Sequence, residues 1–123
     1  MNRIVSVLAT ASEASGELEN PPYDPKKLSL RIVYCGGWGY ERFFLSLKEA
    51  LEVRFPGRID FYPVKDIQPT GNFEITLLNT SPPKLIHSKQ TMPNLGKCSS
   101  EAERKRLYKI LAIYDDYLRK QVS

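Results

Sequence analysis

A seven-residue apolar run that stops at a cysteine and two glycines limits what this chain can fold into. Residues 28–34 are rich in apolar and β-branched side chains, and Cys35, Gly36 and Gly37 follow them directly. Such a run, bounded by glycine, indicates a buried strand that ends in a tight turn. Apolar residues then return at helical spacing between residues 43 and 55, which predicts a helix after the turn.

The rest of the pattern extends this strand and helix into an α/β domain. Residues 58–64 and 73–77 alternate apolar and polar side chains, and residues 84–88 form a short run, so three further strands are predicted. The first two strands and the helix between them form a right-handed βαβ unit, and the last two strands form a hairpin. Ser100 and Glu103 have the spacing of a capping box that starts a final helix. The predicted order is β-α-β-β-β-α, with two helices and a four-stranded mixed sheet.

The first 27 residues differ in composition from the rest. They contain Ala, Ser, Glu, Asn and three prolines without a sustained period, which is typical of a flexible leader. We therefore expect a leader at residues 1–27 and one folded domain at residues 28–123. The first residues loosely resemble a secretory signal, but their apolar part is short, so an untargeted leader is expected. The apolar runs of the chain are too short to span a bilayer.

Length, charge and cysteine content narrow the class of protein. A chain of 123 residues suits one domain. Its net charge of +4 is spread out, and its densest basic cluster, residues 104–106, falls in a helical pattern, so a solvated helix face is expected and no nucleic-acid site. Two cysteines do not make a disulfide framework, which favours reduced thiols and a cytoplasmic location. Cys35, Cys98 and His87 lack the number and spacing of a zinc site, so no metal is expected.

Cys35 is the candidate reactive residue. A cysteine in a glycine turn before a helix lies near unpaired backbone N–H groups and the positive end of the helix dipole, which both favour the thiolate. Gly36, Gly37 and Gly39 allow a tight turn and leave the sulfur approachable. The residue three positions on, where a Cys-x-x-Cys centre has its second thiol, is Trp38. From spacing alone, an inert buried cysteine remains the alternative.

Around this turn the sequence resembles the selenoprotein W family. Residues 32–40 are similar to the segment around the family's Cys-Gly-Ala-Sec-Gly-Tyr centre, and the matching stretches together cover about residues 29–120. Three more stretches agree with the family in order and spacing: Phe55-Pro56-Gly57-Arg58, Thr70-Gly71-Asn72-Phe73-Glu74 and Lys84-Leu85-Ile86-His87-Ser88-Lys89.

The resemblance implies a thioredoxin-like two-layer sandwich and a redox role linked to glutathione or thioredoxin. Cys35 corresponds to the family's cysteine, and Trp38 stands at the position of its selenocysteine or cysteine. Gly36, Gly37 and Gly39 make up the active-site turn. The implied co-substrate is glutathione, the reductant is glutathione or a thioredoxin-type protein, and no tightly bound cofactor is expected. Thiol–disulfide oxidoreductase or antioxidant activity, cell redox homeostasis and further protein partners are implied in the same way, while enzymatic activity itself stays open.

Trp38 is the departure from the family, because an indole cannot form a disulfide or a selenenylsulfide with Cys35. Three explanations stay open. In the first explanation, the natural residue is selenocysteine, whose codon UGA differs by one base from the tryptophan codon UGG. Alternatively, the protein works with one thiol through a mixed disulfide with glutathione. In the third explanation the fold has lost redox chemistry, and Trp38 anchors a protein partner. Ordinary packing of Trp38 over the first helix is the structural alternative.

Four other residues are weaker candidates. Cys98 precedes the last helix and is expected to be a bystander thiol, since a resolving role requires close approach to Cys35. His87 is expected to be structural or exposed. Arg42 and Lys48, on the first helix, are candidates for holding glutathione carboxylates, although such residues usually face water.

Overall fold

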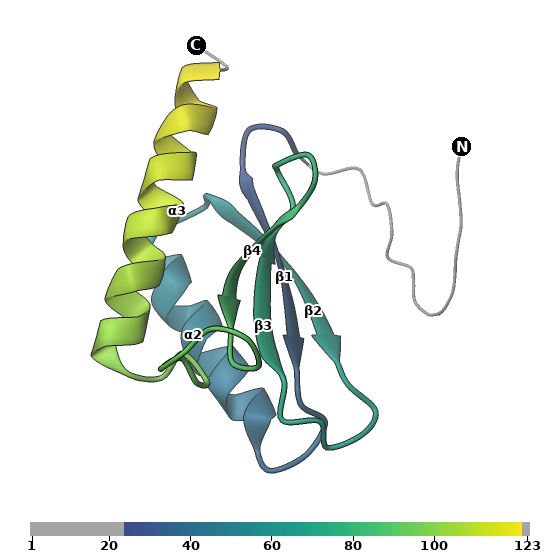
Figure 1. Ribbon diagram of the computed structural model, residues 1–123. Coiled ribbons are helices and arrows are strands. Elements are labelled where there is room, and N and C mark those ends of the chain that lie inside the picture. Colours follow the sequence, from purple (N-terminus) through teal and green to yellow (C-terminus); the bar gives the residue numbers. More distant parts are fainter. Residues whose placement is uncertain (1–23, 122–123) are drawn as a thin grey trace, which may run out of the picture.

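The computed structural model describes residues 24–121 of the chain (Figure 1). Most of the predicted leader, residues 1–23, lies outside the described residues. The described elements follow in the predicted order: β1 (Leu28–Tyr34), α2 (Tyr40–Arg54), β2 (Ile59–Lys65), β3 (Phe73–Leu77), β4 (Lys84–Ser88) and α3 (Glu101–Gln121).

The residues just before β1 are tied to the sheet. The Lys27 ammonium pairs with the Asp60 carboxylate at 2.9 Å, and the Asn79 side chain donates to the Lys27 carbonyl oxygen at 2.9 Å. Arg58 donates to the carbonyl oxygen of Lys26 at 2.7 Å. These bonds attach residues 26 and 27 to β2 and to the loops that contain Arg58 and Asn79.

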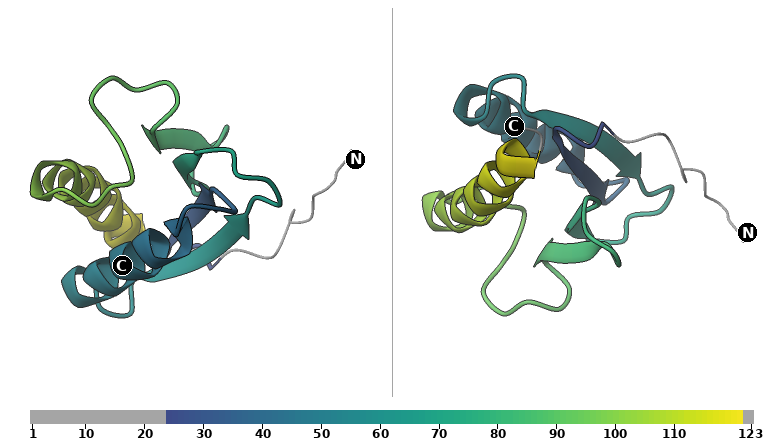
Figure 2. Two further views of the ribbon diagram at one scale, coloured as in Figure 1. Left: turned by 90° about the horizontal axis from the view of Figure 1, so that it is seen from below. Right: turned by 90° about the horizontal axis from the view of Figure 1, so that it is seen from above.

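A four-stranded mixed sheet forms one layer of the molecule and the two helices form the other. The strand order is β2-β1-β3-β4, with β1 parallel to β2 and antiparallel to β3, and β3 antiparallel to β4. Both helices lie on one side of the sheet (Figure 2), where α2 packs on β1 and β2 and α3 packs on β1 and β4. Leu28, Leu30 and Ile32 are completely buried under them, because alternate residues of a strand point to one face. The predicted two-layer α/β architecture is thus confirmed.

The two helices begin in different ways. At α3 the Ser100 hydroxyl accepts the Glu103 N–H at 3.2 Å, and the Glu103 carboxylate accepts the Ser100 N–H at 3.2 Å, so the predicted capping box is confirmed. At α2 the residue before the helix is Gly39, which has a left-handed φ of 72° and makes no side-chain capping bond. The start of α2 is thus built from backbone alone.

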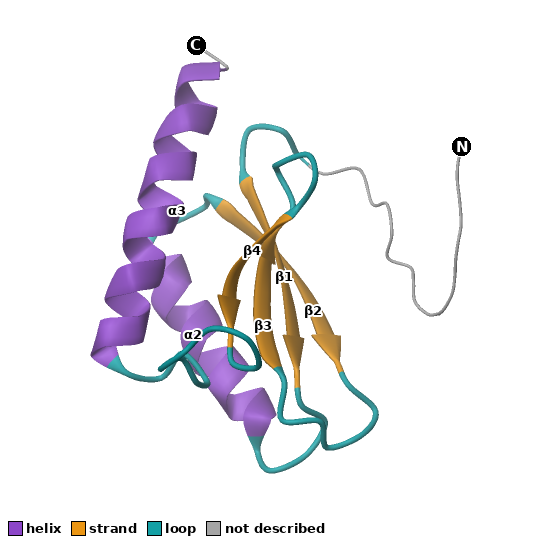
Figure 3. Cartoon of the chain, viewed as in Figure 1, coloured by secondary structure: helices purple, strands orange, loops and turns teal. Residues whose placement is uncertain are grey.

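The connections at one end of the sheet meet at the start of α2. The segment between β1 and α2 and the loop between β2 and β3 both lie at the lower end of the sheet in Figure 3. They adjoin because β1 ends where β3 begins, with Tyr34 paired to Phe73. Cys35 therefore follows the central strand into a place where two connections are in contact.

Candidate active site

Three backbone hydrogen bonds attach the end of β1 and the cysteine turn, residues 35–39, to the β2–β3 loop, residues 66–72. The Cys35 N–H donates to the Asn72 carbonyl at 2.9 Å, and the Gly36 N–H donates to the Gln68 carbonyl at 3.2 Å. The Asp66 N–H donates to the carbonyl oxygen of Tyr34 at 2.9 Å. The turn and this loop therefore form one structural unit.

Of the predicted turn glycines, Gly36 is required by close approach of another backbone segment, Gly37 lies against a side chain, and Gly39 is favoured by its dihedral angle. A Cβ atom on Gly36 would lie 2.0 Å from the Asp66 carbonyl oxygen, a distance that no side chain can occupy. A Cβ atom on Gly37 would lie 3.0 Å from the Pro69 side chain. Gly39 has a left-handed φ of 72°, which favours glycine. The turn reaches its geometry because these positions carry no side chain.

Hydrogen bonds to sulfur lower the pKa of the Cys35 thiol. Burial acts in the opposite direction, since the residue is 1% exposed and desolvation raises the pKa. The backbone N–H groups of Gly37, Gly71 and Thr70 outweigh this effect, and the Gly37 nitrogen lies 3.3 Å from Sγ. These donors stabilise the thiolate, which is the nucleophilic form of cysteine.

The Thr70 hydroxyl lies in the same donor group but has only one proton to give. Asp66 accepts that proton at 2.5 Å, and the hydroxyl oxygen in turn accepts the Asn72 N–H at 3.2 Å. The Asn72 side chain also donates to Asp66 at 2.9 Å. We therefore assign the lowered pKa of Cys35 to the backbone donors, and assign to Asp66 the role of holding the loop that supplies two of them.

Trp38 is not packed over α2. Its side chain is 70% exposed, and its backbone has a left-handed φ of 55°, which is unfavourable for a bulky residue. The edge of its indole ring lies over Gly71, with Cζ3 4.0 Å from the position of a Cβ there. Trp38 thus lies beside the loop that donates to the Cys35 sulfur.

Lys89 and Gln90 approach the same glycine, and the sequence analysis did not single them out. The Lys89 Nζ and the Gln90 Nε2 atoms each lie 3.8 Å from the position of a Cβ on Gly71. Lys89 is the last residue of the stretch 84–89 that resembles the family, and this was the one feature of the sequence that could have marked it as a site residue. Its position over Gly71 depends on the β3–β4 pairing, which places the end of β4 beside the start of β3.

The weaker candidates fall in different places. The Arg42 guanidinium lies over the turn, with Nε 3.6 Å from the position of a Cβ on Gly39. Lys48 pairs with Glu52 at 3.2 Å, farther along α2, and its ammonium lies over the Phe61 ring.

His87 and Cys98 both belong to the core. His87 is completely buried, with Nε2 2.9 Å from the Gly96 carbonyl oxygen and the ring edge-on to Phe73. Cys98 is completely buried and its thiol is free, as is that of Cys35. Burial raises the pKa of Cys98 to about 12, and the neighbouring Glu103 acts in the same direction. Residues 24–121 contain no group of three His, Cys, Asp or Glu side chains arranged to hold a metal ion.

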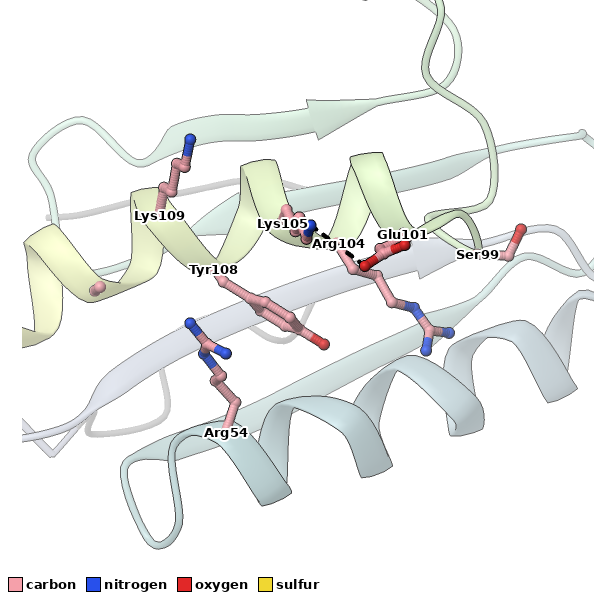
Figure 4. A pocket seen from close by; sticks show the side chains of 8 residues that line it. Arg54, Ser99, Glu101, Arg104, Lys105, Tyr108 and Lys109 are labelled. Carbon is pink, nitrogen blue, oxygen red and sulfur yellow. Dashed lines mark ion pairs between the residues drawn. The ribbon is translucent and has the colours of Figure 1, made fainter.

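A hollow away from the cysteine turn lies between the two helices, with a cavity volume of about 690 Å³ (Figure 4). The Arg54 guanidinium on α2 stacks 4.8 Å from the centre of the Tyr108 ring on α3. Arg104 reaches across to α2 and donates to Ser46 at 3.1 Å. Arg106 belongs to the same basic cluster but turns away and donates to the Ile86 carbonyl at 2.7 Å, so the cluster is not one solvated face. The hollow carries positive charge but no thiol lines it, so the redox candidate remains Cys35.

The fold and the cysteine turn together define a thioredoxin-like protein of the selenoprotein W type. The Rdx family model matches residues 29–107, and the chain belongs to this family. A solved structure, a selenoprotein W-related protein from Vibrio cholerae, superimposes with a TM-score of 0.52 at 17% identity. That match covers 72% of this chain and 98% of the other, which confirms the fold.

Curated relatives agree with this assignment. Selenoprotein W of Macaca mulatta is 46% identical over 63 residues, which span 51% of this chain and 68% of the relative. Selenoprotein W of Mus musculus is 46% identical over 63 residues, with coverage of 51% and 67%. Selenoprotein V of Homo sapiens is 29% identical over 96 residues, which cover 78% of this chain and 25% of the relative. Family membership supports a function of the redox type, and neither described helix is long and apolar enough to cross a membrane.

Proposed function

We propose that the protein is a thiol redox protein that uses Cys35 as its nucleophile and glutathione as its co-substrate. The observation that carries the proposal is the set of backbone N–H donors from Gly37, Thr70 and Gly71 at the Cys35 sulfur. A lowered pKa increases the thiolate fraction near neutral pH, and thiolate is the form that attacks disulfides.

The proposed reaction is a monothiol exchange in two steps. The Cys35 thiolate attacks the glutathione sulfur of a glutathionylated substrate, so that a Cys35–glutathione disulfide forms and the substrate thiolate leaves and takes a proton from water. A free glutathione thiolate then attacks the glutathione sulfur of this mixed disulfide. Cys35 is released as thiolate and oxidised glutathione leaves. Overall, the disulfide bond of the glutathionylated substrate is exchanged for that of oxidised glutathione, and one free glutathione is consumed for each substrate thiol released.

We extend the proposal to position 38, where the natural gene encodes selenocysteine. Trp38 has a largely exposed side chain and a left-handed backbone, so core packing gives no reason for a tryptophan there. With a selenol at this position, the selenolate would attack the glutathione sulfur first, and Cys35 would then displace glutathione from selenium to close a selenenylsulfide; with Trp38 the reaction proceeds at Cys35 alone. The codon in the native nucleotide sequence tests this point: UGA with a selenocysteine insertion element supports it, and UGG contradicts it.

An interaction module without redox activity is the second candidate. The observation in its favour is the same exposure of Trp38, because tryptophan is enriched at the energetic centres of protein interfaces. This candidate requires no reaction at Cys35, so the experiment below separates the two.

The test of the redox proposal is mass spectrometry after incubation with oxidised glutathione. We expect a single adduct of about 305 Da on Cys35, the mass that one glutathione residue adds by thiol–disulfide exchange. Cys35→Ser should abolish the adduct, and Cys98→Ser should retain it. A Cys35 thiol that stays unmodified in the folded protein would exclude the proposed reaction and favour the interaction module.

The wider role follows from the same chemistry. Reduced thiols at both cysteines suit a reducing compartment, so we place the protein in the cytoplasm, where glutathione or a thioredoxin-type protein acts as reductant and the protein contributes to redox homeostasis.

A further inference from the structure

Three polar or aromatic side chains converge over Gly71 from two connections that are distant in sequence. Trp38 comes from the turn after β1, while Lys89 and Gln90 follow β4. The nearest atoms of these side chains lie 4.0, 3.8 and 3.8 Å from the position of a Cβ on Gly71. We call this group of Trp38, Gly71, Lys89 and Gln90 the Gly71 cluster.

The Gly71 cluster lies next to the reactive sulfur. The Gly71 N–H acts on the Cys35 sulfur and lowers its pKa, and the Lys89 ammonium lies 3.8 Å from the position of a Cβ on the same glycine. Adding the hydrogen-bond length and the bonds within Gly71 places the ammonium within roughly 10 Å of the sulfur. A tripeptide thiol linked to Cys35 can reach that far with its terminal carboxylate.

The Lys89 ammonium is available to bind an anion. The Glu74 carboxylate, which lies beside this connection, is engaged by the backbone, since it accepts the N–H groups of Lys89 at 3.0 Å and Gln90 at 3.3 Å, together with the Ser88 hydroxyl. Glu74 thereby orients the connection after β4 without neutralising the ammonium. Within residues 24–121 the Lys89 ammonium has no carboxylate partner.

Gln90 and Trp38 add the contacts that a peptide-like ligand needs. The Gln90 side-chain amide is a hydrogen-bond donor beside the ammonium, and amide and ammonium together match the two oxygens of a carboxylate. The exposed indole of Trp38 offers an apolar surface at the edge of the same cluster. The Arg42 guanidinium lies on the other side of the turn, over Gly39.

We propose that Lys89 and Gln90 form a carboxylate-binding subsite that selects carboxylate-bearing thiols and disulfides, glutathione among them, over neutral ones; this rests on the proposed reaction at Cys35 and does not depend on which residue the natural gene encodes at position 38. The subsite binds the substrate and takes no part in electron transfer. It contacts the ligand only, because the thiolate is stabilised by the backbone N–H groups of Gly37, Thr70 and Gly71.

The test compares a disulfide that carries carboxylates with a neutral one. The rate of mixed-disulfide formation at Cys35 is measured with oxidised glutathione, which carries carboxylates, and with bis(2-hydroxyethyl) disulfide, which is neutral. Lys89→Gln should slow the reaction with oxidised glutathione about fivefold, the size of a partly exposed charged contact, and leave the neutral disulfide unaffected. Added salt should slow the wild-type reaction with oxidised glutathione and affect the variant less.

Lys84→Gln is the matched control, because it removes the same charge from an exposed residue at the other end of β4. It should leave both rates unchanged. An unchanged rate of Lys89→Gln with oxidised glutathione, or an equal loss with both disulfides, would overturn the subsite. Failure of the proposed function has a different signature, since wild-type Cys35 would then react with neither disulfide.

Discussion

Cys35 and Cys98 are both buried thiols that precede a helix, and yet their acidities move in opposite directions. The pKa of Cys35 is below its ordinary value, whereas burial raises that of Cys98 to about 12. The two pKa values differ because different N–H donors are available around each sulfur. At α3 the capping box uses the Ser100 and Glu103 N–H groups and brings a carboxylate close to Cys98.

At the Cys35 turn no side chain caps α2, and N–H groups of the turn and of the β2–β3 loop point at sulfur. A position before a helix therefore does not by itself make a cysteine acidic. What matters is whether backbone donors remain free and whether another part of the chain supplies more of them.

The largest expected effect is the difference in alkylation rate between the two thiols. Only thiolate reacts, so a pKa below 9.0 for Cys35 against about 12 for Cys98 predicts a rate ratio of at least about a thousandfold at neutral pH. The Cys35 rate should rise with pH and level off at a lower pH than that of an ordinary cysteine, while the Cys98 rate keeps rising. Iodoacetamide labelling of the native protein, read by peptide mass spectrometry, measures both rates. Equal rates would remove the distinction between the sites.

Gly36→Ala should change the surroundings of Cys35 and leave those of Cys98 unchanged. The new Cβ atom would fall 2.0 Å from the Asp66 carbonyl oxygen, so the turn must separate from the β2–β3 loop at a cost of about 3 kcal/mol. The pKa of Cys35 should rise, because Thr70 and Gly71 then lose their places beside sulfur. Urea unfolding and the pH profile of labelling measure the two effects.

Gly57→Ala is the control for that variant. Gly57 also has a left-handed φ, of 70°, but nothing lies within 4 Å of its Cβ position, so about 1 kcal/mol of backbone strain is expected. A loss of stability for Gly36→Ala no larger than this would mean that the close contact is relieved without moving the turn.

The last effect concerns Cys98, is absent near neutral pH and appears only at alkaline pH. The unfolded thiol ionises near pH 8.5 and the folded one near 12, so stability is fully present below about pH 8.5 and is lost as the pH rises through that window. Between about pH 9 and pH 11 the wild type should lose about 1.4 kcal/mol per pH unit from this thiol. Cys98→Ala has no thiol to ionise at this position, so its free energy of unfolding should fall less steeply with pH. Urea titrations at several pH values would measure this difference. Parallel pH dependences would show that Cys98 ionises normally in the folded chain.

Much of the fold was predictable because its signals are local. The strand before Cys35 is continuous and apolar, the helix after it has a clear period, and the capping box at residues 100–103 has a fixed spacing. The interpretation of residues 104–106 as one solvated face was wrong in part, since Arg106 donates to the Ile86 carbonyl. Side-chain direction on a helix depends on neighbours that no local pattern specifies.

The cysteine turn itself was thus determined by the sequence: Cys35, its glycines and the departure at Trp38 can be read from residues 35–39 alone. Tertiary structure decided the chemistry of that turn. The donors at Thr70 and Gly71 reach the sulfur because β3 pairs with β1, and Lys89 reaches Gly71 because β4 pairs with β3. The acidity of a thiol and the charge beside it depend on atoms within a few ångströms, and strand pairing brings those atoms together from distant parts of the chain.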